Sequence, residues 1–253
     1  MEGRGGAQGR DLRTMKVVLV LLTFVLLYGV YEAIRVYSLA TKSQTLIAGA
    51  TAFSREGGAM DMLVLGDSTA VGVGATPETS VPGRVSDFLN ASVENYAVSG
   101  ARVVGLFAQI EKAQKESYDF VLIQVGANDI THGTPPQEVR ADLDKILSKA
   151  SSLSERVVVL TAGKVGEAPL IPWFARSLLN SRTAKVRDVF METTGKHGAV
   201  YVDIYSRELN FSDDVPRFYA PDQFHLSGDG YGEWFSIVRE YVEKKWPELE
   251  RNK

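Results

Sequence analysis

A serine, a histidine and an aspartate of this chain have the types and the spacing that acyl transfer requires. Ser68 follows Gly66-Asp67 directly, and Asp222 precedes His225 by three residues. A serine hydroxyl is a weak nucleophile unless a nearby base removes its proton, and an imidazole has the pKa range for that task. An aspartate on the other ring nitrogen would fix the tautomer of the base and stabilise its charged form. We therefore expect Ser68 to be the nucleophile, His225 the general base and Asp222 the residue that orients it.

The same chemistry needs fixed hydrogen-bond donors for the oxyanion that forms when a carbonyl carbon is attacked. The backbone N–H groups of Ser68 and Gly100 are two candidate donors, and the side-chain amide of Asn128 is a third. Gly100 comes from the dipeptide Ser99-Gly100, and Asn128 belongs to the block Gly126-Ala127-Asn128-Asp129. The sequence thus predicts an oxyanion hole built from three separate segments.

The numbers of cysteine and histidine residues exclude several other kinds of reactive or metal-binding site. The chain has three histidines and no cysteine, which excludes disulfides, thiolate metal sites and a cysteine nucleophile. His132, beside the Asn128 block, is the rival base, whereas His197 is expected at the opposite edge of the fold. No two histidines share a helix face or a close spacing, so we expect no metal site and no cofactor.

The elements that must carry these residues follow from hydrophobic periodicity. Short apolar runs predict strands at 60–65, 93–98, 120–125, 156–161 and 199–204. Helical patterns between and after them predict helices at 82–90, 102–116, 135–152, 173–193 and 229–244. Strands that are apolar throughout and alternate with helices indicate a parallel sheet covered on both faces.

Such sheets carry their active sites at the carboxyl ends of the strands. Ser68, Gly100 and Asn128 follow the first, second and third predicted strands, so all three are expected at one edge. The segment 222–225 lies in a loop before the last helix, where it can fold back over that edge.

Taken together, these motifs resemble the SGNH, or GDSL-like, hydrolase superfamily of bacterial-type lipolytic esterases. Gly66-Asp67-Ser68, Gly100, the block 126–129 and Asp222-x-x-His225 occur in the family's order, and the resemblance spans about residues 60–245. It implies a flavodoxin-like three-layer α/β/α sandwich with a five-stranded parallel sheet. It also implies the roles given above for Ser68, Gly100, Asn128, Asp222 and His225. Thr69 stands where the name-giving pattern has leucine, which affects the subfamily rather than the chemistry.

One alternative fold and one alternative function remain. An ordinary α/β-hydrolase is suggested by Gly66-x-Ser68-x-Ala70, but its acid and histidine usually lie far apart in sequence. A catalytically idle binding module would have no need to keep Ser68, Asn128, Asp222 and His225 together.

The N-terminal segment has a membrane-targeting pattern. Residues 17–31 form an apolar run broken only by Thr23 and Gly29, and the preceding residues include four basic ones, Arg4, Arg10, Arg13 and Lys16. Basic residues before an apolar helix favour a cytoplasmic N-terminus. A cleaved signal peptide is the competing interpretation, because Ser38 and Ala40 have the spacing of a peptidase site.

This pattern predicts four parts of the chain. We expect a basic cytoplasmic N-terminus at 1–16, a signal-anchor or transmembrane helix at 17–40, a linker at 41–59 and the SGNH hydrolase domain at 60–253. The catalytic domain would then be membrane-anchored and extracytoplasmic, or secreted if the segment is cleaved. A formal net charge of −3 gives no basic surface for nucleic acid, which we do not expect as a partner.

The sequence is compatible with two classes of ester substrate. The membrane segment and the resemblance favour a lipase-like or lysophospholipase-like esterase, with an O-acetyl deacetylase or acyltransferase acting on cell-envelope glycans as the alternative. The apolar segment 169–174 follows the fourth strand and is expected to form one wall of the substrate pocket, through Ile171 and Trp173. Its other interpretation is an anchor that holds the start of the next helix on the core.

Overall fold

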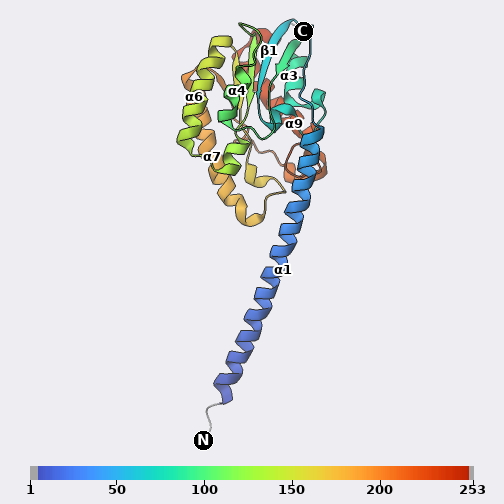
Figure 1. The fold of residues 1–253 in the computed structure, drawn as a ribbon, viewed down its shortest axis with the longest axis vertical. Coiled ribbons are helices and arrows are strands. Elements are labelled where there is room, and N and C mark those ends of the chain that lie inside the picture. The colour runs from blue at the N-terminus through green and yellow to red at the C-terminus, as the bar shows by residue number, and fades with distance from the viewer. Residues whose placement is uncertain (1–4, 251–253) are drawn as a thin grey trace.

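The computed structural model describes residues 5–250, with side chains described for residues 14–249. It consists of one long N-terminal helix, α1 (Gly5–Gly49), that projects away from an α/β/α domain (Figure 1). Arg4 of the basic segment 1–16 lies outside the described residues, as do the side chains of Arg10 and Arg13.

The domain is built on a five-stranded sheet in which every pairing is parallel. Its strand order is β2-β1-β3-β4-β5, which is the flavodoxin-like order. The strands are β1 (Met60–Gly66), β2 (Ala91–Asn95), β3 (Phe120–Gln124), β4 (Val157–Leu160) and β5 (Val200–Val202). The predicted fold class, a three-layer α/β/α sandwich with a five-stranded parallel sheet, is therefore confirmed.

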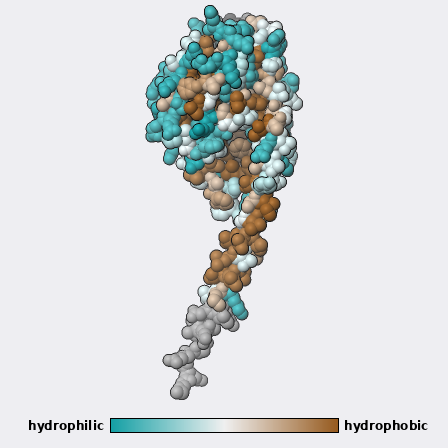
Figure 2. Space-filling view, viewed as in Figure 1, coloured by the Kyte–Doolittle hydropathy of each residue, from teal (hydrophilic) through white to brown (hydrophobic). Residues whose placement is uncertain are grey.

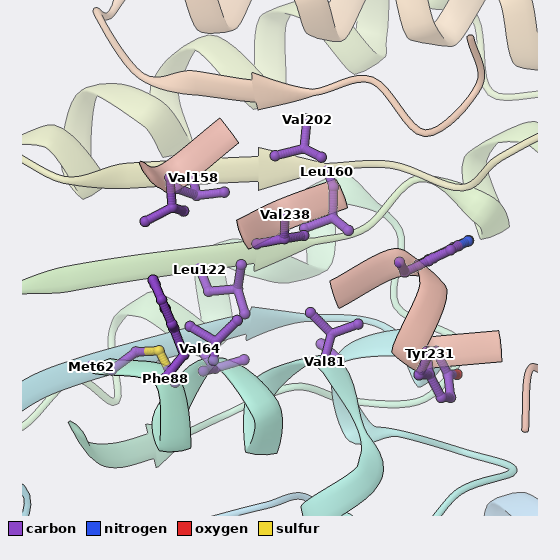
Figure 3. Packing of buried hydrophobic residues seen from close by; sticks show 14 of the residues in the cluster. Met62, Val64, Val81, Phe88, Leu122, Val158, Leu160, Val202, Tyr231 and Val238 are labelled. Atoms are coloured by element: carbon purple, nitrogen blue, oxygen red, sulfur yellow. The ribbon is translucent and has the colours of Figure 1, made fainter. Parts of the chain in front are cut away.

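Alternate residues of each inner strand point to opposite faces, and helices bury both faces. On β1, Met62 and Val64 belong to one core cluster, while Leu63 and Leu65 belong to the other. The first cluster packs under helices α3 (Val81–Leu89) and α9 (Gly228–Lys245), and Figure 3 shows strand side chains meeting Val238 of α9. The second lies under helices α4, α6 and α7, on the opposite side of the sheet in Figure 1: Leu106–Ile110, Pro136–Leu153 and Trp173–Lys196.

Short helices fill the loops at the sheet edges. Three are α-helices: α2 (Ser68–Val71), α5 (Ala127–His132) and α8 (Val215–Phe218). The 3-10 turns are Pro77–Thr79, Val103–Gly105, Val165–Glu167, Phe211–Asp214 and Pro247–Glu250. Two of the α-helices, α2 and α5, begin at or next to candidate site residues.

The helix predicted at 102–116 is shorter than expected. After the turn Val103–Gly105, helix α4 ends at Ile110, and the chain continues in turns. The backbone amides of Gln114 and Lys115 donate to the hydroxyl of Tyr118, at 3.1 and 3.3 Å, instead of to helical carbonyls. Local hydrogen bonds to the Tyr118 hydroxyl, three and four residues further along the chain, have replaced the last turns of the helix.

Helix α1 extends beyond the predicted membrane segment. It continues to Gly49, so the expected linker at 41–59 begins as helix and becomes irregular only afterwards. The hydroxyls of Thr41 and Thr45 donate to carbonyls four residues earlier, which satisfies these polar side chains within the helix. Among the described residues, Thr14–Gly49 is long and apolar enough to cross a membrane, by length and composition, and a signal sequence would meet the same criterion.

Candidate active site

The turn after β1 holds Ser68 in a fixed position. Ser68 is the first residue of α2, and Asp67 caps this helix by accepting the backbone N–H of Thr69 on Oδ1, at 2.9 Å. Gly66 has φ of 158°, and a Cβ there would lie 2.1 Å from the carbonyl oxygen of Gln124. Only glycine fits where β1 and β3 approach so closely.

Gln109 supports this turn, although it is not among the residues predicted for the site. Its buried side chain accepts the backbone N–H of Gly66 at 2.8 Å and donates to the Gly66 carbonyl at 2.9 Å. Gln109 lies on α4 at a position where helical periodicity predicts a core residue. A polar residue on the apolar face of a predicted helix is the sequence pattern that could have identified it.

Ser68, His225 and Asp222 form one hydrogen-bonded chain. His225 Nε2 lies 3.0 Å from Ser68 Oγ, and His225 Nδ1 lies 2.6 Å from Asp222 Oδ2. Because an ionised carboxylate only accepts hydrogen bonds, Nδ1 carries the proton and Nε2 of the neutral ring is left to accept the serine O–H. This arrangement can move a proton from the hydroxyl to the imidazole.

Asp222 is fully buried, and its charge is compensated locally. Its Oδ1 accepts the backbone N–H groups of Phe224 and His225, at 3.1 and 3.0 Å. Burial opposes ionisation, but the hydrogen bond and charge of His225, together with the two amides, outweigh it and lower the pKa of Asp222. The carboxylate is therefore held in the ionised form that the imidazole needs.

Hydrogen bonds connect the segments that carry the other two candidate donors, Gly100 and Asn128. The Asn128 side chain donates to the carbonyl of Ala101 at 3.0 Å, which connects the segment after β3 to the loop containing Gly100. That loop begins beside β1, where Val98 N–H donates to the Gly66 carbonyl at 3.0 Å. Gly100 is exposed and has φ of 84°, which favours glycine.

The rival histidines have different partners. Asp129 precedes His132 by three residues, the spacing of Asp222 and His225, yet its carboxylate accepts the backbone N–H of Val103 at 3.0 Å. His132 Nδ1 lies 2.8 Å from the carbonyl oxygen of Asn128. His197 contacts Asp144 at 2.9 Å, at the end of α7 that precedes β5.

Asp67 is the second buried carboxylate of the site. Its Oδ1 accepts both the backbone and the hydroxyl of Thr69, whereas Oδ2 has no hydrogen-bond partner among the described residues. Burial raises the pKa of Asp67 to about 6, against the hydrogen bonds of Thr69 and the charge of His225, which lower it. This side chain holds the turn and lies outside the hydrogen-bonded chain of Ser68.

A largely apolar pocket borders Ser68 and His225. Residues from the loops after β4 and β5, the loop before α9 and α9 itself line it, among them Val165, Ala168, Ile204, Leu209, Phe211, Tyr219, Phe224, Leu226, Tyr231 and Trp234. Sequence reasoning missed these residues, although the loops after β4 and β5 begin at the same sheet edge as the turn that carries Ser68. Lys164, Glu167 and Arg207 add charge to its lining.

Ile171 and Trp173, the expected wall of the substrate pocket, do not line the pocket that contains Ser68. Ile171 is half-buried and packs against the core cluster under α7. Trp173 is 67% exposed and packs edge to face with Phe174, with ring centroids 6.0 Å apart. The segment instead contacts the loop that contains Asp222 and His225 through its backbone, since Leu170 N–H donates to the carbonyl of Gln223 at 3.0 Å.

Within the described part of the chain, no group of three or more histidine, aspartate and glutamate side chains could hold a metal ion.

Comparisons with known proteins point to one family. A model described as the GDSL-like Lipase/Acylhydrolase family matches residues 64–232. An arylesterase of Vibrio mimicus is 31% identical over an alignment of 105 residues, which covers 39% of this chain and 52% of that protein. The chain thus covers about half the length of this curated relative.

Solved structures of other proteins share the fold. A member of the lipolytic protein G-D-S-L family from Veillonella parvula DSM 2008 has a TM-score of 0.59 and 20% identity, over 72% of this chain and 97% of that one. Phospholipase A1 from Streptomyces albidoflavus NA297 has a TM-score of 0.58 and 18% identity, over 72% and 99%. At these identities the likeness concerns the fold.

Proposed function

The chain belongs to the GDSL-like lipase/acylhydrolase family, and from this premise we propose that it hydrolyses carboxylic acyl esters with Ser68 as the nucleophile. The observation that carries the proposal is the hydrogen-bonded chain from Ser68 Oγ through His225 to the buried carboxylate of Asp222. A base in contact with a serine and oriented by a third group is the arrangement that activates a hydroxyl.

In the first half of the reaction, Ser68 Oγ attacks the ester carbonyl carbon while its proton passes to His225 Nε2. The resulting tetrahedral oxyanion collapses, the bond to the alcohol oxygen breaks, and Nε2 returns the proton to the leaving alcohol. In the second half, Nε2 takes a proton from water as the water oxygen attacks the acyl-enzyme. The acid then leaves, and Ser68 regains its proton.

Three donors support the oxyanion in this scheme. Ser68 begins α2, where the first backbone N–H groups have no intrahelical acceptor, and Gly100 contributes a second N–H from its exposed loop. The Asn128 amide has two N–H hydrogens, and its bond to Ala101 uses one of them. The second hydrogen would bond the oxyanion, with the first keeping the amide in place.

The lining of the pocket favours an acyl chain over a sugar. Most of its side chains are aliphatic or aromatic, and such surfaces bind hydrocarbon by removing it from water. We therefore favour a lipase-like or lysophospholipase-like esterase. A deacetylase or acyltransferase acting on cell-envelope glycans would instead use the charged lining residues Lys164, Glu167 and Arg207.

The test is a series of aryl esters from acetate to palmitate, run beside an acetylated glycan with the full chain in detergent. A fluorophosphonate probe is applied to the wild type and to Ser68→Ala. We expect probe labelling of the wild type only, and hydrolysis of esters with longer acyl groups than acetate. Equal labelling of both proteins would reject Ser68 as nucleophile. Turnover of the glycan alone, or transfer of the acyl group to an added sugar, would favour the alternatives.

We also propose that α1 anchors the protein and that the catalytic domain, residues 60–253, is extracytoplasmic. Lys16 and the basic residues before it favour a cytoplasmic N-terminus. Cleavage after Ala40 would cut a continuous helix next to Leu39, which is buried against the domain. A phosphatase reporter that works only outside the cytoplasm, fused after Lys253, should be active. A well-expressed but inactive fusion would argue for the opposite orientation.

A further inference from the structure

Three large apolar side chains are exposed at the start of α7. Trp173 and Phe174 are 67% and 63% exposed, and Leu178, one helical turn later, is also exposed. We call these three residues the aromatic ledge. Soluble surfaces carry single apolar side chains at many places, but a cluster of large ones marks a site that faces something other than water.

The ledge lies against α1. Pro172, Trp173 and Phe174 share one groove with α1 residues between Val25 and Val36. This groove is almost entirely apolar, and Figure 2 shows the apolar surface of α1 continuing onto the end of the domain from which α1 leaves.

Polar contacts fix the helix at this level. The Arg35 guanidinium pairs with Glu32 at 2.8 Å and donates to the backbone carbonyls of Pro169 and Leu170, at 3.0 and 3.2 Å. The backbone N–H of Leu170 in turn donates to the carbonyl of Gln223 in the loop Asp222–His225, which we call the catalytic loop. The side of α1 that carries Glu32 and Arg35 is thus connected through one backbone segment to the loop of Asp222 and His225.

Helix geometry gives the depth of the ledge. The apolar run starts at Val17, and a straight helix rising about 1.5 Å per residue crosses a hydrocarbon core of about 30 Å in about 20 residues. Such a span ends near Val36, so Glu32 and Arg35 lie at its outer boundary, and α1 residues 25–36 extend from about the middle of the span to that boundary. Trp173 and Phe174 are at that same level, where aromatic side chains favour the membrane interface.

We propose that the aromatic ledge inserts into the outer leaflet of the membrane that α1 spans, and that the substrates are esters of lipids in that leaflet. The inference rests on the proposed esterase function and names its substrate class. The occupant of the ledge is the bilayer, because its apolar surface is continuous with that of the helix. Insertion holds the catalytic loop at the lipid surface through Leu170 and Gln223.

Tryptophan fluorescence tests the insertion directly. The full chain is reconstituted into phosphatidylcholine vesicles with lipids brominated near the headgroup end of the acyl chain, which quench nearby indoles. The chain has three tryptophans, and the other two, Trp234 and Trp246, are buried or half-buried in the domain. We expect quenching of the wild type that Trp173→Phe abolishes. The same quenching in both proteins would overturn the insertion.

Kinetics test the substrate class. For Trp173→Ser/Phe174→Ser in vesicles, we expect the ratio of kcat/KM on a phospholipid ester to kcat/KM on a soluble aryl ester to fall about tenfold or more, because two aromatic side chains no longer hold the domain at the surface. Met191→Ser, which alters an exposed apolar residue near the other end of α7, is the matched control and should leave the ratio unchanged.

The outcomes separate the two proposals. Absence of hydrolysis of any ester by the wild type would reject the proposed function. Hydrolysis of the aryl ester with an unchanged ratio in the double variant would reject the ledge and leave the esterase function standing. Association of the chain into dimers that the double variant prevents, without bromolipid quenching, would show that a second copy covers the ledge instead.

Discussion

The catalytic loop, Asp222–His225, is hydrogen-bonded to the segment Pro169–Phe174, but the two differ in the burial of their side chains. The catalytic loop buries polar groups: Asp222 is 0% exposed and His225 is 6% exposed. The neighbouring segment ends in two large aromatic side chains, Trp173 and Phe174, that are mostly exposed.

This difference in burial reflects what surrounds the side chains of each region. A buried charge is tolerated only when partners replace water, and Asp222 has the imidazole and two backbone amides. An exposed aromatic pair next to an apolar helix needs no such partners if lipid covers it. Under the two proposals, the polar loop serves chemistry in a dry site, and the apolar segment contacts a membrane.

The strongest test of the polar loop is Asp222→Asn. An asparagine amide can donate to Nδ1 and so favour the tautomer with its proton on Nε2, which cannot accept the serine proton. We expect kcat on a soluble aryl ester to fall by roughly 1000- to 10,000-fold, as in other serine triads. Circular dichroism should show an intact fold. A loss smaller than about tenfold would mean that Asp222 does not orient the base.

Asn128→Ala tests one of the proposed oxyanion donors, which follows β3 and lies outside the catalytic loop. We expect kcat to fall about 100- to 1000-fold with little change in KM, since a bond to the oxyanion forms mainly in the transition state. The melting temperature is measured alongside, because the side chain also bonds Ala101. A lower melting temperature with unchanged kcat would assign Asn128 to the fold alone.

Asp67→Asn tests the second buried carboxylate, whose pKa is raised by burial whereas that of Asp222 is lowered. Because Asp67 has a raised pKa in the folded chain, the folded state keeps its proton between pH 3.8 and about 6, and the free energy of unfolding falls as pH rises through this window. The cost reaches at most about 3 kcal/mol above the window. Asparagine cannot ionise, so the difference in unfolding free energy between variant and wild type should shift in favour of the variant from pH 4 to pH 7. A difference that does not depend on pH would contradict this interpretation.

The smallest effect is expected for Trp173→Ser on stability. An exposed side chain contributes little to the core, so the free energy of unfolding in detergent should change by less than about 0.5 kcal/mol. Phe190→Ala, a fully buried aromatic residue of the same helix, is the contrast and should cost about 3 to 5 kcal/mol. Similar losses for both variants would show that Trp173 is part of the packed core and not a free ledge.

Much of the fold could be predicted because its signals are local. Strand β3 is a run of apolar residues between turns, and such a run is buried on both faces in any parallel sheet. Strand β2 is shorter than predicted, Ala91–Asn95 instead of 93–98, yet Tyr96 and Val98 still bond to the carbonyls of Val64 and Gly66. The end of a regular strand depends on such pairing geometry, which periodicity does not encode.

By itself, the sequence determined the α/β fold, the family and the segments that meet at one sheet edge, because strand and helix periods and motif order are properties of short stretches of chain. Tertiary structure decided which aspartate pairs with which histidine: Asp129 and His132 have the spacing of Asp222 and His225, but only the second pair is formed. It also decided that Trp173 faces α1 and not the pocket. The contact of His225 with Ser68 joins residues 157 positions apart, and packing of the whole domain sets such distances.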